Sequence, residues 1–305
     1  MLSIRNLSKT YSGNVRALDG VDLDIPIGMF GLLGPNGAGK SSLMRTIASL
    51  QKPDAGTISL GGVNLLDDPD ATRRIIGYLP QDFGVYPKVS AARLLDHIAA
   101  LKGIPKSIRK DVTEDLLHRV NLWQVRQQAL GTYSGGMRQR FGVAQALLGS
   151  PKIVIVDEPT AGLDPEERHR LLDLLVDVAR STRVVMSTHN VQDVAELCPL
   201  MAIVSKGRVI YSGTTTGAMD AIKDRVWRKL YDRGHGEHMP PAQSILSTRL
   251  VTGCTEVHIT ADQKPEGYGA VEPDLSDAYF FHLKHGEQAT GAAKEHGASA
   301  HTHVQ

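Results

Sequence analysis

The chain has 305 residues, enough for one large domain with additions or for two domains, and 41% of them are hydrophobic. Its 34 Lys and Arg nearly balance its 33 Asp and Glu, and a formal net charge of +1 argues against a broad nucleic-acid surface. No nucleic-acid partner is therefore expected. The 2 cysteines, Cys198 and Cys254, have no metal-ligand spacing and are expected to be reduced thiols.

No apolar run approaches the roughly 20 residues that a bilayer span requires. The amino terminus also lacks an apolar segment of signal-peptide length. We therefore expect a cytoplasmic chain whose contact with a membrane, if it has one, comes through a partner.

Apolar runs and alternating patterns predict a series of strands. The predicted strands are residues 2–4, 21–25, 29–33, 57–60, 75–79, 153–156 and 183–187. Helices are expected at about 39–50 and 165–180, and the spacing becomes helical throughout about 90–149. There, Leu94, Leu95, Ile98 and Leu101 are expected to share one helix face.

Strands that alternate with helices predict an α/β fold with a mostly parallel sheet. We expect antiparallel strands at the amino terminus, an inserted helical subdomain and a small carboxy-terminal α+β domain. The expected boundaries are 1–220 for the core, about 82–150 for its helical subdomain, 221–284 for the small domain and 285–305 for a disordered tail.

The first chemical motif is a glycine-rich loop between a predicted strand and a predicted helix. It reads Gly34-Pro35-Asn36-Gly37-Ala38-Gly39-Lys40-Ser41 and is followed by Ser42. Glycines let backbone N–H groups converge on a phosphate chain, and the helix that follows adds its positive end. Lys40 is expected to reach the β- and γ-phosphates and Ser41 to bind Mg²⁺. The motif predicts a P-loop core that binds ATP.

The second motif is a pair of acids, Asp157 and Glu158, at the end of the apolar strand 153–156. Burying charge is costly, and Mg²⁺ with a water nucleophile would account for it. Asp157 is expected to hold Mg²⁺ and Glu158 to act as the general base. A solvated strand end is the alternative when the pair is considered without the phosphate loop.

The segment TYSGGMRQR (residues 132–140), in this order along the chain with the two motifs above, resembles the signature of ABC ATPases. The resemblance covers roughly residues 2–213. Tyr133 and Met137 depart from the commonest signature residues, Leu and Gln. These departures bear on details of the signature loop and not on the ATPase assignment.

The resemblance implies further roles. Tyr11 corresponds to the aromatic residue that stacks on adenine, Gln81 to the Q-loop residue with catalytic and metal roles, and His189 to the switch histidine. Asp164 belongs to the D-loop and is also a good helix N-cap. Each of these residues taken alone has an ordinary structural explanation.

Ser134, Gly135 and Gly136 open a predicted helix, and in the family this loop completes the ATP site of the opposite subunit. The resemblance therefore implies a dimer, expected to be a homodimer, that sandwiches two ATP. An ordinary Ser-Gly helix start is the alternative. The absence of a membrane span implies a separate permease, so the chain would be peripheral on the inner face of the cell membrane.

The segment EPDLSDAYF (residues 272–280) looks like the ending of exporters with a separate permease chain. An N-capped amphipathic helix explains it equally well. A soluble ABC ATPase with a regulatory or repair role is the alternative function. The histidines near the carboxyl end, at positions 282, 285, 296, 301 and 303, are expected to lie in a solvated disordered tail rather than to bind metal.

Overall fold

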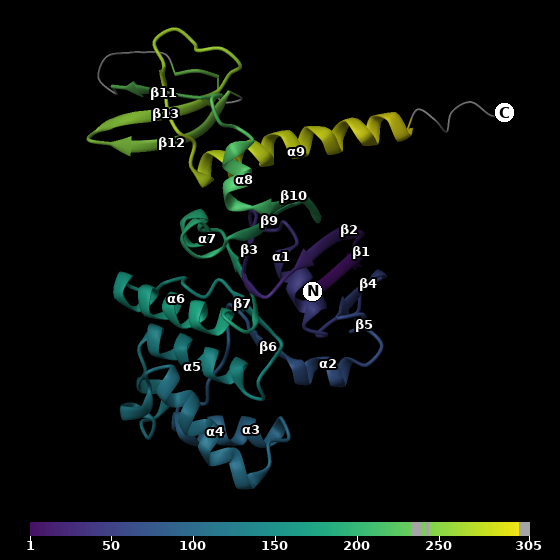
Figure 1. Ribbon diagram of the computed structural model, residues 1–305, viewed down its shortest axis with the longest axis vertical. Helices are drawn as coiled ribbons and strands as arrows, with labels where there is room; N and C mark the ends of the chain where they lie inside the picture. The colour runs from purple at the N-terminus through teal and green to yellow at the C-terminus, as the bar shows by residue number, and fades with distance from the viewer. Residues whose placement is uncertain (233–238, 242–243, 299–305) are drawn as a thin grey trace, which may run out of the picture.

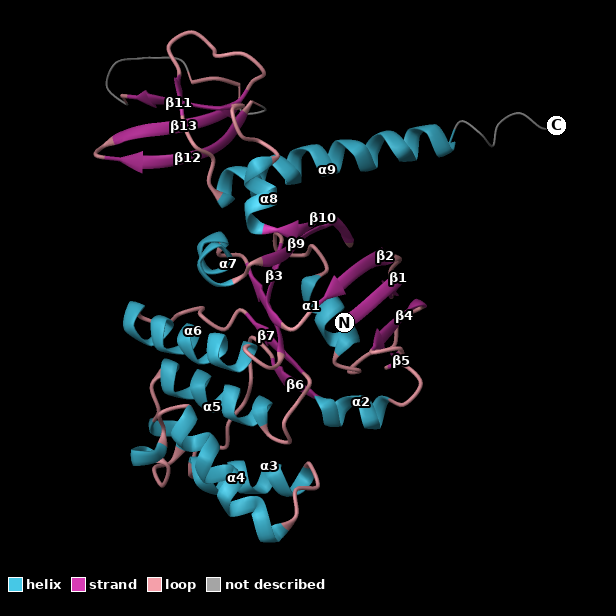
Figure 2. Ribbon diagram, in the orientation of Figure 1, coloured by secondary structure: helices cyan, strands magenta, loops and turns pink. Residues whose placement is uncertain are grey.

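The computed structural model describes residues 1–232, 239–241 and 244–298. The molecule is elongated, with a small sheet at one end and a helical part at the other (Figure 1). An α/β core lies between them, and Figure 2 shows that strands dominate its middle whereas helices make up the far end.

The core is organised by a 6-stranded sheet of order β10-β9-β3-β8-β7-β6. Its strands are β3 (Gly28–Leu33), β6 (Ile76–Leu79), β7 (Ile153–Asp157), β8 (Arg183–Thr188), β9 (Leu200–Ser205) and β10 (Arg208–Thr214). All neighbouring pairs from β9 to β6 are parallel, and only β10 is antiparallel to its neighbour. The carboxyl ends of five strands therefore lie at one edge, where ligands bind in open α/β sheets.

A second sheet of order β2-β1-β4-β5 covers one face of the core. It consists of β1 (Leu2–Tyr11), β2 (Val15–Ile25), β4 (Ala55–Leu60) and β5 (Val63–Asn64), all antiparallel. Alternate residues of β1 and β2, such as Leu2 and Leu23, pack with Leu43 and Met44 of α1 (Lys40–Ile47) in one apolar cluster. The short helix α2 (Pro69–Ile75) follows this sheet.

The opposite face is covered by α5 (Gly135–Leu147), α6 (Pro165–Ala179) and α7 (Val191–Leu197). Beyond α5 lie α3 (Ala91–Leu101), α4 (Lys106–Arg119) and two short 3₁₀ turns, η1 (Trp123–Val125) and η2 (Leu130–Thr132). One buried cluster runs from these helices to the sheet, which attaches the helical part to the core. The mixed α/β fold, the mostly parallel sheet and the helical insertion are as predicted.

The predicted helix face is not buried along its whole length. Leu94 and Leu95 are buried, but Leu101 is 75% exposed. Leu101 is the last residue of α3, and the helix ends there with Lys102 as its C-cap. A helical period predicts that residues share a face but not where the neighbouring helix stops covering that face.

The carboxy-terminal part is a 4-stranded antiparallel sheet of order β12-β13-β11-β14 with two helices. Its elements are α8 (Thr215–Asp220), β11 (Val226–Tyr231), β12 (Ile245–Val251), β13 (Cys254–Thr260), β14 (Gly269–Ala270) and α9 (Leu275–Ala298). Helix α9 crosses between this sheet and the core (Figure 1). Leu275 and Tyr279 of α9 join the same buried cluster as the core helices, whereas the small sheet also has a separate cluster of its own, made of Tyr231, Val257, Ile259 and Tyr268.

Helix α9 continues to Ala298, past residue 285, where a disordered tail was expected to begin. His282 packs against Tyr211 with ring centroids 4.5 Å apart, and His285 stacks on Phe281 at 4.0 Å. These two histidines are therefore part of an ordered helix. The predicted tail residues His301 and His303 lie outside the described residues, and the side chain of His296 is also not described.

Burial raises the pKa of the Cys198 thiol to about 12, and Cys198 and Cys254 are both free, as expected. Among the described helices, none combines the length and the hydrophobicity needed to cross a membrane.

Candidate functional site

The phosphate loop joins β3 to α1 and requires its glycines. Gly34, Gly37 and Gly39 all have positive φ, which is unfavourable for other residues. A Cβ on Gly34 would lie 2.3 Å from the carbonyl oxygen of Val204, and one on Gly39 would lie 2.4 Å from that of Ala17. The loop backbone is thus held against its neighbours at a distance that admits only hydrogen at these positions.

The remaining loop residues divide between the surface and the interior. Pro35 and Asn36 are exposed, whereas Ala38 is buried and its N–H donates to the carbonyl of Pro35 at 3.2 Å. This turn brings the start of α1 directly after the loop, so the amino end of α1 faces the same space as the loop. The local structure is that of an anion-binding site, as the motif predicts.

Lys40 is only 6% exposed although it carries a charge. Its Nζ donates to the carbonyl oxygens of Gly34 at 2.5 Å and Pro35 at 3.2 Å. Burial lowers the pKa of the Lys40 ammonium, and the charges of Glu158 and Asp157 act in the opposite direction. A buried cation that is held by neutral carbonyls is well placed to gain an anionic partner.

Asp157 ends β7 and is held from two sides. Ser187 Oγ, at the end of β8, donates to its Oδ1 at 2.9 Å, and Ser41 Oγ donates to its Oδ2 at 3.3 Å. A carboxylate and a hydroxyl at this spacing are oxygen ligands of the kind that Mg²⁺ prefers. The residues present therefore fit the ion that the motifs imply. Sequence reasoning missed Ser187, which the strand partner of Asp157 could have revealed.

Glu158 and His189 meet directly. The Nδ1 of His189 lies 2.9 Å from Oε2 of Glu158. The Glu158 side chain is buried at 9% exposure, whereas His189 is 66% exposed, so the histidine closes the outer side of the carboxylate. Glu158 also has φ of 48°, a left-handed conformation that is costly for a glutamate and typical of functional positions.

Tyr11 ends β1 beside the start of α1. Its hydroxyl lies 3.1 Å from Ser42 Oγ and donates to Gln51 Oε1 at 2.7 Å, while its ring remains 38% exposed. An exposed ring next to the phosphate loop is the arrangement expected for an aromatic residue that stacks on a base. Its hydroxyl contacts also fix the ring against α1.

Ser134 is the N-cap of α5, and its Oγ accepts from Met137 N–H at 3.2 Å. A Cβ on Gly136 would lie 2.3 Å from Oε2 of Glu167, so this glycine lets the signature helix approach α6 closely. Arg140, one turn further along α5, pairs with the same Glu167 carboxylate. In the described part of the chain, the Ser134 hydroxyl is hydrogen-bonded within α5 and not to the phosphate loop of the same chain.

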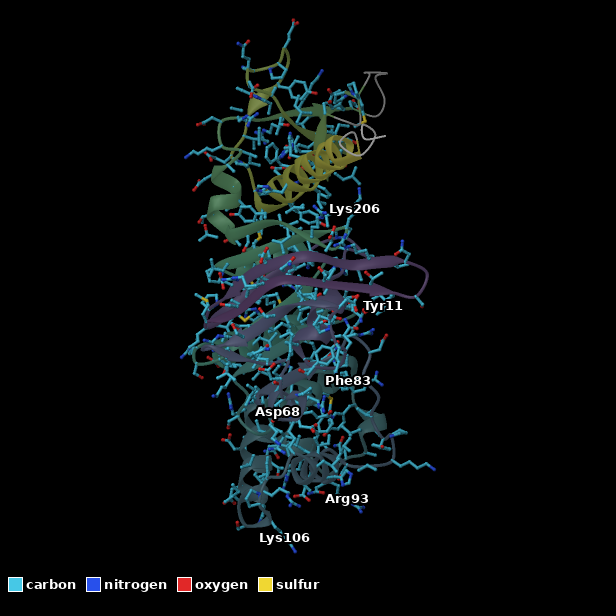
Figure 3. The ribbon with its side chains drawn as sticks, turned by 90° about the vertical axis from the view of Figure 1, so that its right-hand side faces the viewer. Tyr11, Asp68, Phe83, Arg93, Lys106 and Lys206 are labelled. Atoms are coloured by element: carbon cyan, nitrogen blue, oxygen red, sulfur yellow. The ribbon has the colours of Figure 1, made fainter. Side chains whose placement is uncertain are left out.

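Gln81, Gly135 and the D-loop residues Ala161 to Leu163 line one cleft of about 560 Å³. Gln81 is exposed at the mouth of this cleft, directly after β6. Figure 3 shows Phe83 between Tyr11 and Arg93 along the long axis, so the loop after Gln81 bridges from the nucleotide end of the core to the helical part. Gln81, the signature and the D-loop thus share one surface.

Asp164 has the N-cap role that the sequence predicts. Its Oδ1 accepts from Glu167 N–H at 2.9 Å, and Pro165 is the first residue of α6. The cap fixes the D-loop that precedes it.

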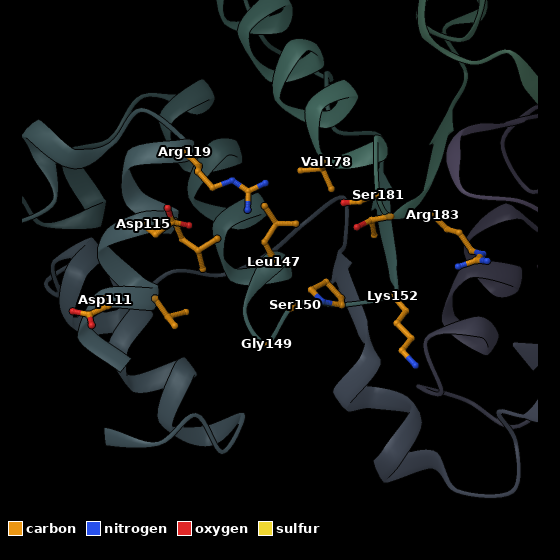
Figure 4. Close-up of a pocket in the computed structure, with 14 residues that line it drawn as sticks. Asp111, Asp115, Arg119, Leu147, Gly149, Ser150, Lys152, Val178, Ser181 and Arg183 are labelled. Carbon is orange, nitrogen blue, oxygen red and sulfur yellow. The ribbon is translucent and has the colours of Figure 1, made fainter. Parts of the chain in front are cut away.

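Another cavity, of about 670 Å³, lies at the opposite edge of the sheet, near the starts of β7 and β8 (Figure 4). Several charged side chains line it, including Arg119, Lys152 and Arg183. In Figure 4 the ends of the Lys152 and Arg183 side chains point away from its middle. The cationic groups do not converge there, and the groups fit for chemistry gather at the carboxyl edge instead.

Comparison with known proteins identifies relatives of this chain. The family model described as "ABC transporter" matches residues 18–161. The daunorubicin/doxorubicin resistance ATP-binding protein DrrA of Streptomyces peucetius is 35% identical over 249 residues, which are 80% of this chain and 74% of that protein. The methionine import ATP-binding protein MetN of Bordetella avium is 39% identical over 225 residues, which are 70% of this chain and 62% of that protein.

Solved structures show the same relationship. An ATP-binding subunit of an ABC transporter has a TM-score of 0.65 and 29% identity, covering 72% of this chain and 92% of its own. A dimeric ATP-binding cassette, bound to ADP and Pi in a post-hydrolysis state, has a TM-score of 0.63 and 26% identity. The match covers 70% of this chain and 98% of that chain. The chain therefore belongs to the ABC transporter family, as an ATP-binding subunit with the fold and activity of an ABC ATPase.

Proposed function

We propose that this chain is the motor subunit of an ABC exporter, which dimerises around two ATP and drives a separate membrane permease. The observation that carries the proposal is the cluster at the carboxyl ends of β3, β7 and β8. There Ser41 lies 3.3 Å from Asp157, and Glu158 lies 2.9 Å from His189. These are the groups needed to hold a metal ion and to direct a water toward a phosphate.

In this proposal the P-loop amides and Lys40 bind the phosphate chain, and Tyr11 stacks on the adenine. Ser41 and Asp157, with Gln81, would hold Mg²⁺, which would supply positive charge beside the phosphates. Glu158 accepts the proton of the attacking water, and His189 donates a hydrogen bond to the γ-phosphate. The 2.9 Å contact between His189 and Glu158 keeps both side chains facing the same space.

The proposed dimer accounts for the signature loop. Ser134 caps α5 beside an exposed surface, and the nucleotide that it serves would belong to the opposite subunit. Asp164 and the rest of the D-loop line the same cleft as Gly135, so they would face that subunit too. One of the similar solved structures is described as a dimer with ADP and Pi.

The direction of transport rests on a weaker observation. Residues 272–280 look like the exporter ending, and the relative from S. peucetius is named for drug resistance. The B. avium relative is named for import, so similarity in the ATPase core does not choose the direction. In this chain Asp274 and Asp277 cap the start of α9 reciprocally, with N–H to carboxylate distances of 3.0 and 3.3 Å.

Co-expression tests the permease. The chain should fractionate with membranes when a multi-span membrane protein encoded next to it is co-expressed, and a pull-down of that protein should recover the chain with ATPase activity. Vesicles that contain both should accumulate substrate on the side opposite to the ATPase. A permease pull-down that never recovers the chain would favour the soluble alternative.

A further inference from the structure

A buried carboxylate lies directly behind the catalytic cluster and has no role in the scheme above. Asp193, in the first turn of α7, is 0% exposed. Its Oδ2 accepts from Thr160 Oγ1 at 2.6 Å. Its Oδ1 accepts from Arg168 Nε at 2.9 Å, from Arg168 Nη2 at 2.6 Å and from Asn190 Nδ2 at 2.9 Å. Both oxygens of this buried carboxylate are thus hydrogen-bonded, Oδ1 by three donors and Oδ2 by one.

The residues on either side of Asp193 lead back to the catalytic pair. Thr160 is two positions after Glu158, and Asn190 directly follows His189. Glu158 and His189 themselves meet at 2.9 Å. The contacts therefore form a closed ring in which Glu158 and His189 stand on one side and Asp193 joins their two loops on the other.

This ring is fixed to the rigid sheet. Val194, the neighbour of Asp193, packs so closely on β3 that a Cβ at Gly31 would lie 2.6 Å from its Cγ1. Hydrogen bonding to Asp193 raises the pKa of Arg168, which places a permanent cation against the buried charge. A buried carboxylate that is hydrogen-bonded on a packed helix holds its partners in one arrangement.

Glu158 needs such support because of its own backbone. Its φ of 48° is a conformation that persists only where the surroundings over-determine it. The N–H of Glu158 donates to Ser187 O at 2.9 Å, which fixes the loop at its start. Thr160 fixes the loop at its other end through Asp193.

We infer that Asp193 is a positioning residue for ATP hydrolysis, which holds the loops of Glu158 and His189 in register through Thr160 and Asn190. The inference rests on the proposed roles of Glu158 and His189. Asp193 is 0% exposed, so it would act through those two residues. Loss of the ring would leave ATP binding intact and would misplace the base, and a shift of about 1 Å costs on the order of 10²-fold in rate.

Two substitutions test the ring. Asp193→Asn removes the charge and one acceptor, and Thr160→Val removes only one hydroxyl. Thr72→Val is the matched control, because Thr72 is also a buried threonine, donating to Leu65 O at 2.7 Å in α2, away from the site. Steady-state hydrolysis gives kcat, and equilibrium binding of a non-hydrolysable ATP analogue gives Kd.

We expect kcat to fall by about 10- to 100-fold in Asp193→Asn and by a smaller factor in Thr160→Val, with Kd unchanged within about twofold. Thr72→Val should keep the wild-type kcat. Unchanged kcat in both ring variants would overturn the inference, and so would a loss of kcat that is matched by an equal loss of analogue binding. Thr160→Val keeps the test decisive if Asp193→Asn does not fold.

A second comparison separates positioning from general damage. If Asp193 acts through Glu158 and His189, adding Asp193→Asn to a variant that carries both Glu158→Gln and His189→Ala should lower the residual single-turnover rate by less than about twofold. A further 10-fold loss would show that Asp193 acts elsewhere and would refute the inference. If Glu158→Gln alone hydrolyses ATP like wild type, the proposed base is wrong, which is a separate failure.

Discussion

Two different substitutions of Lys40 distinguish the effect of its charge from the effect of its packing. The side chain is 6% exposed, and its Nζ donates to two loop carbonyls, of Gly34 and Pro35. Lys40→Met keeps the length of the stem and removes only the ammonium. Lys40→Ala removes both and leaves a cavity under the loop.

The structure sets the expected size of each effect. Hydrogen bonds from a charged donor contribute roughly 1.5–3 kcal/mol, but burial already disfavours the charge, as the lowered pKa of Lys40 shows. These contributions oppose each other, so Lys40→Met should change the free energy of unfolding by less than about 1 kcal/mol. Lys40→Ala should lose about 1–2 kcal/mol more through lost packing. Both should lower kcat by about 10²–10³-fold, as expected for one missing donor to the developing charge.

The assay pairs steady-state ATP hydrolysis with thermal unfolding in the absence of nucleotide. Lys102→Met is the control, because Lys102 is also partly buried and donates to a carbonyl, that of Leu148, at 2.9 Å, far from the site. It should keep the wild-type kcat. If Lys40→Met hydrolyses ATP within tenfold of wild type, the phosphates do not bind where we place them.

Two further substitutions, at Glu167 and at His258, have predicted effects on the free energy of unfolding. Glu167→Leu should cost about 3 kcal/mol of unfolding free energy in urea denaturation, because it leaves the Arg140 guanidinium without its carboxylate partner. Adding Arg140→Met should recover most of that cost, and a cost below about 1 kcal/mol for Glu167→Leu alone would contradict this. The His258–Asp277 contact predicts a pH dependence, since hydrogen bonding to Asp277 raises the pKa of His258. Burial alone would raise the pKa of Asp277, but bonds from His258 and Ser247 lower it. The stability that His258 contributes is fully present below its ordinary pKa of about 6.5 and is lost as pH rises through its raised pKa. The stability that Asp277 contributes is fully present above its ordinary pKa of about 3.9 and is lost as pH falls through its lowered pKa. The difference in unfolding free energy between wild type and His258→Gln should therefore be largest between about pH 4 and 6.5. Substitution of the exposed His169 by Gln is the control and should show no such maximum. A pH-independent difference for His258→Gln would refute the proposed stabilisation by the His258–Asp277 contact.

The positions of the candidate site residues were predictable because short motifs fix them locally. The glycine loop and the acid pair each follow an apolar strand, and parallel strands bring their carboxyl ends to one edge whatever the rest of the chain does. The position of Lys40, Asp157 and Glu158 at this edge of the sheet could therefore be predicted from the sequence. The mixed α/β class followed from the alternation of strands and helices.

Residues that act through tertiary contacts could not be found in this way. Asp193 is an ordinary acid near the start of a short helix, and Arg168 is one of two arginines on α6. Only the fold shows that they meet in the interior. The same applies to α9, where Gly and His residues suggested disorder, although Ala, Glu and Lys between them favour the helix observed to residue 298.

Glu158→Gln measures the central claim most directly. The substitution keeps size and hydrogen bonding but removes the base and a negative charge beside the triphosphate, so ATP binding should not weaken. With Mg²⁺-ATP the variant should hydrolyse at least about 10²-fold more slowly than wild type and should accumulate as a dimer in size exclusion at high protein concentration. ADP should leave it monomeric, and adding Ser134→Arg should abolish the dimer by blocking the facing nucleotide. Hydrolysis at the wild-type rate, or an ATP-bound variant that stays monomeric even with the permease, would contradict the account.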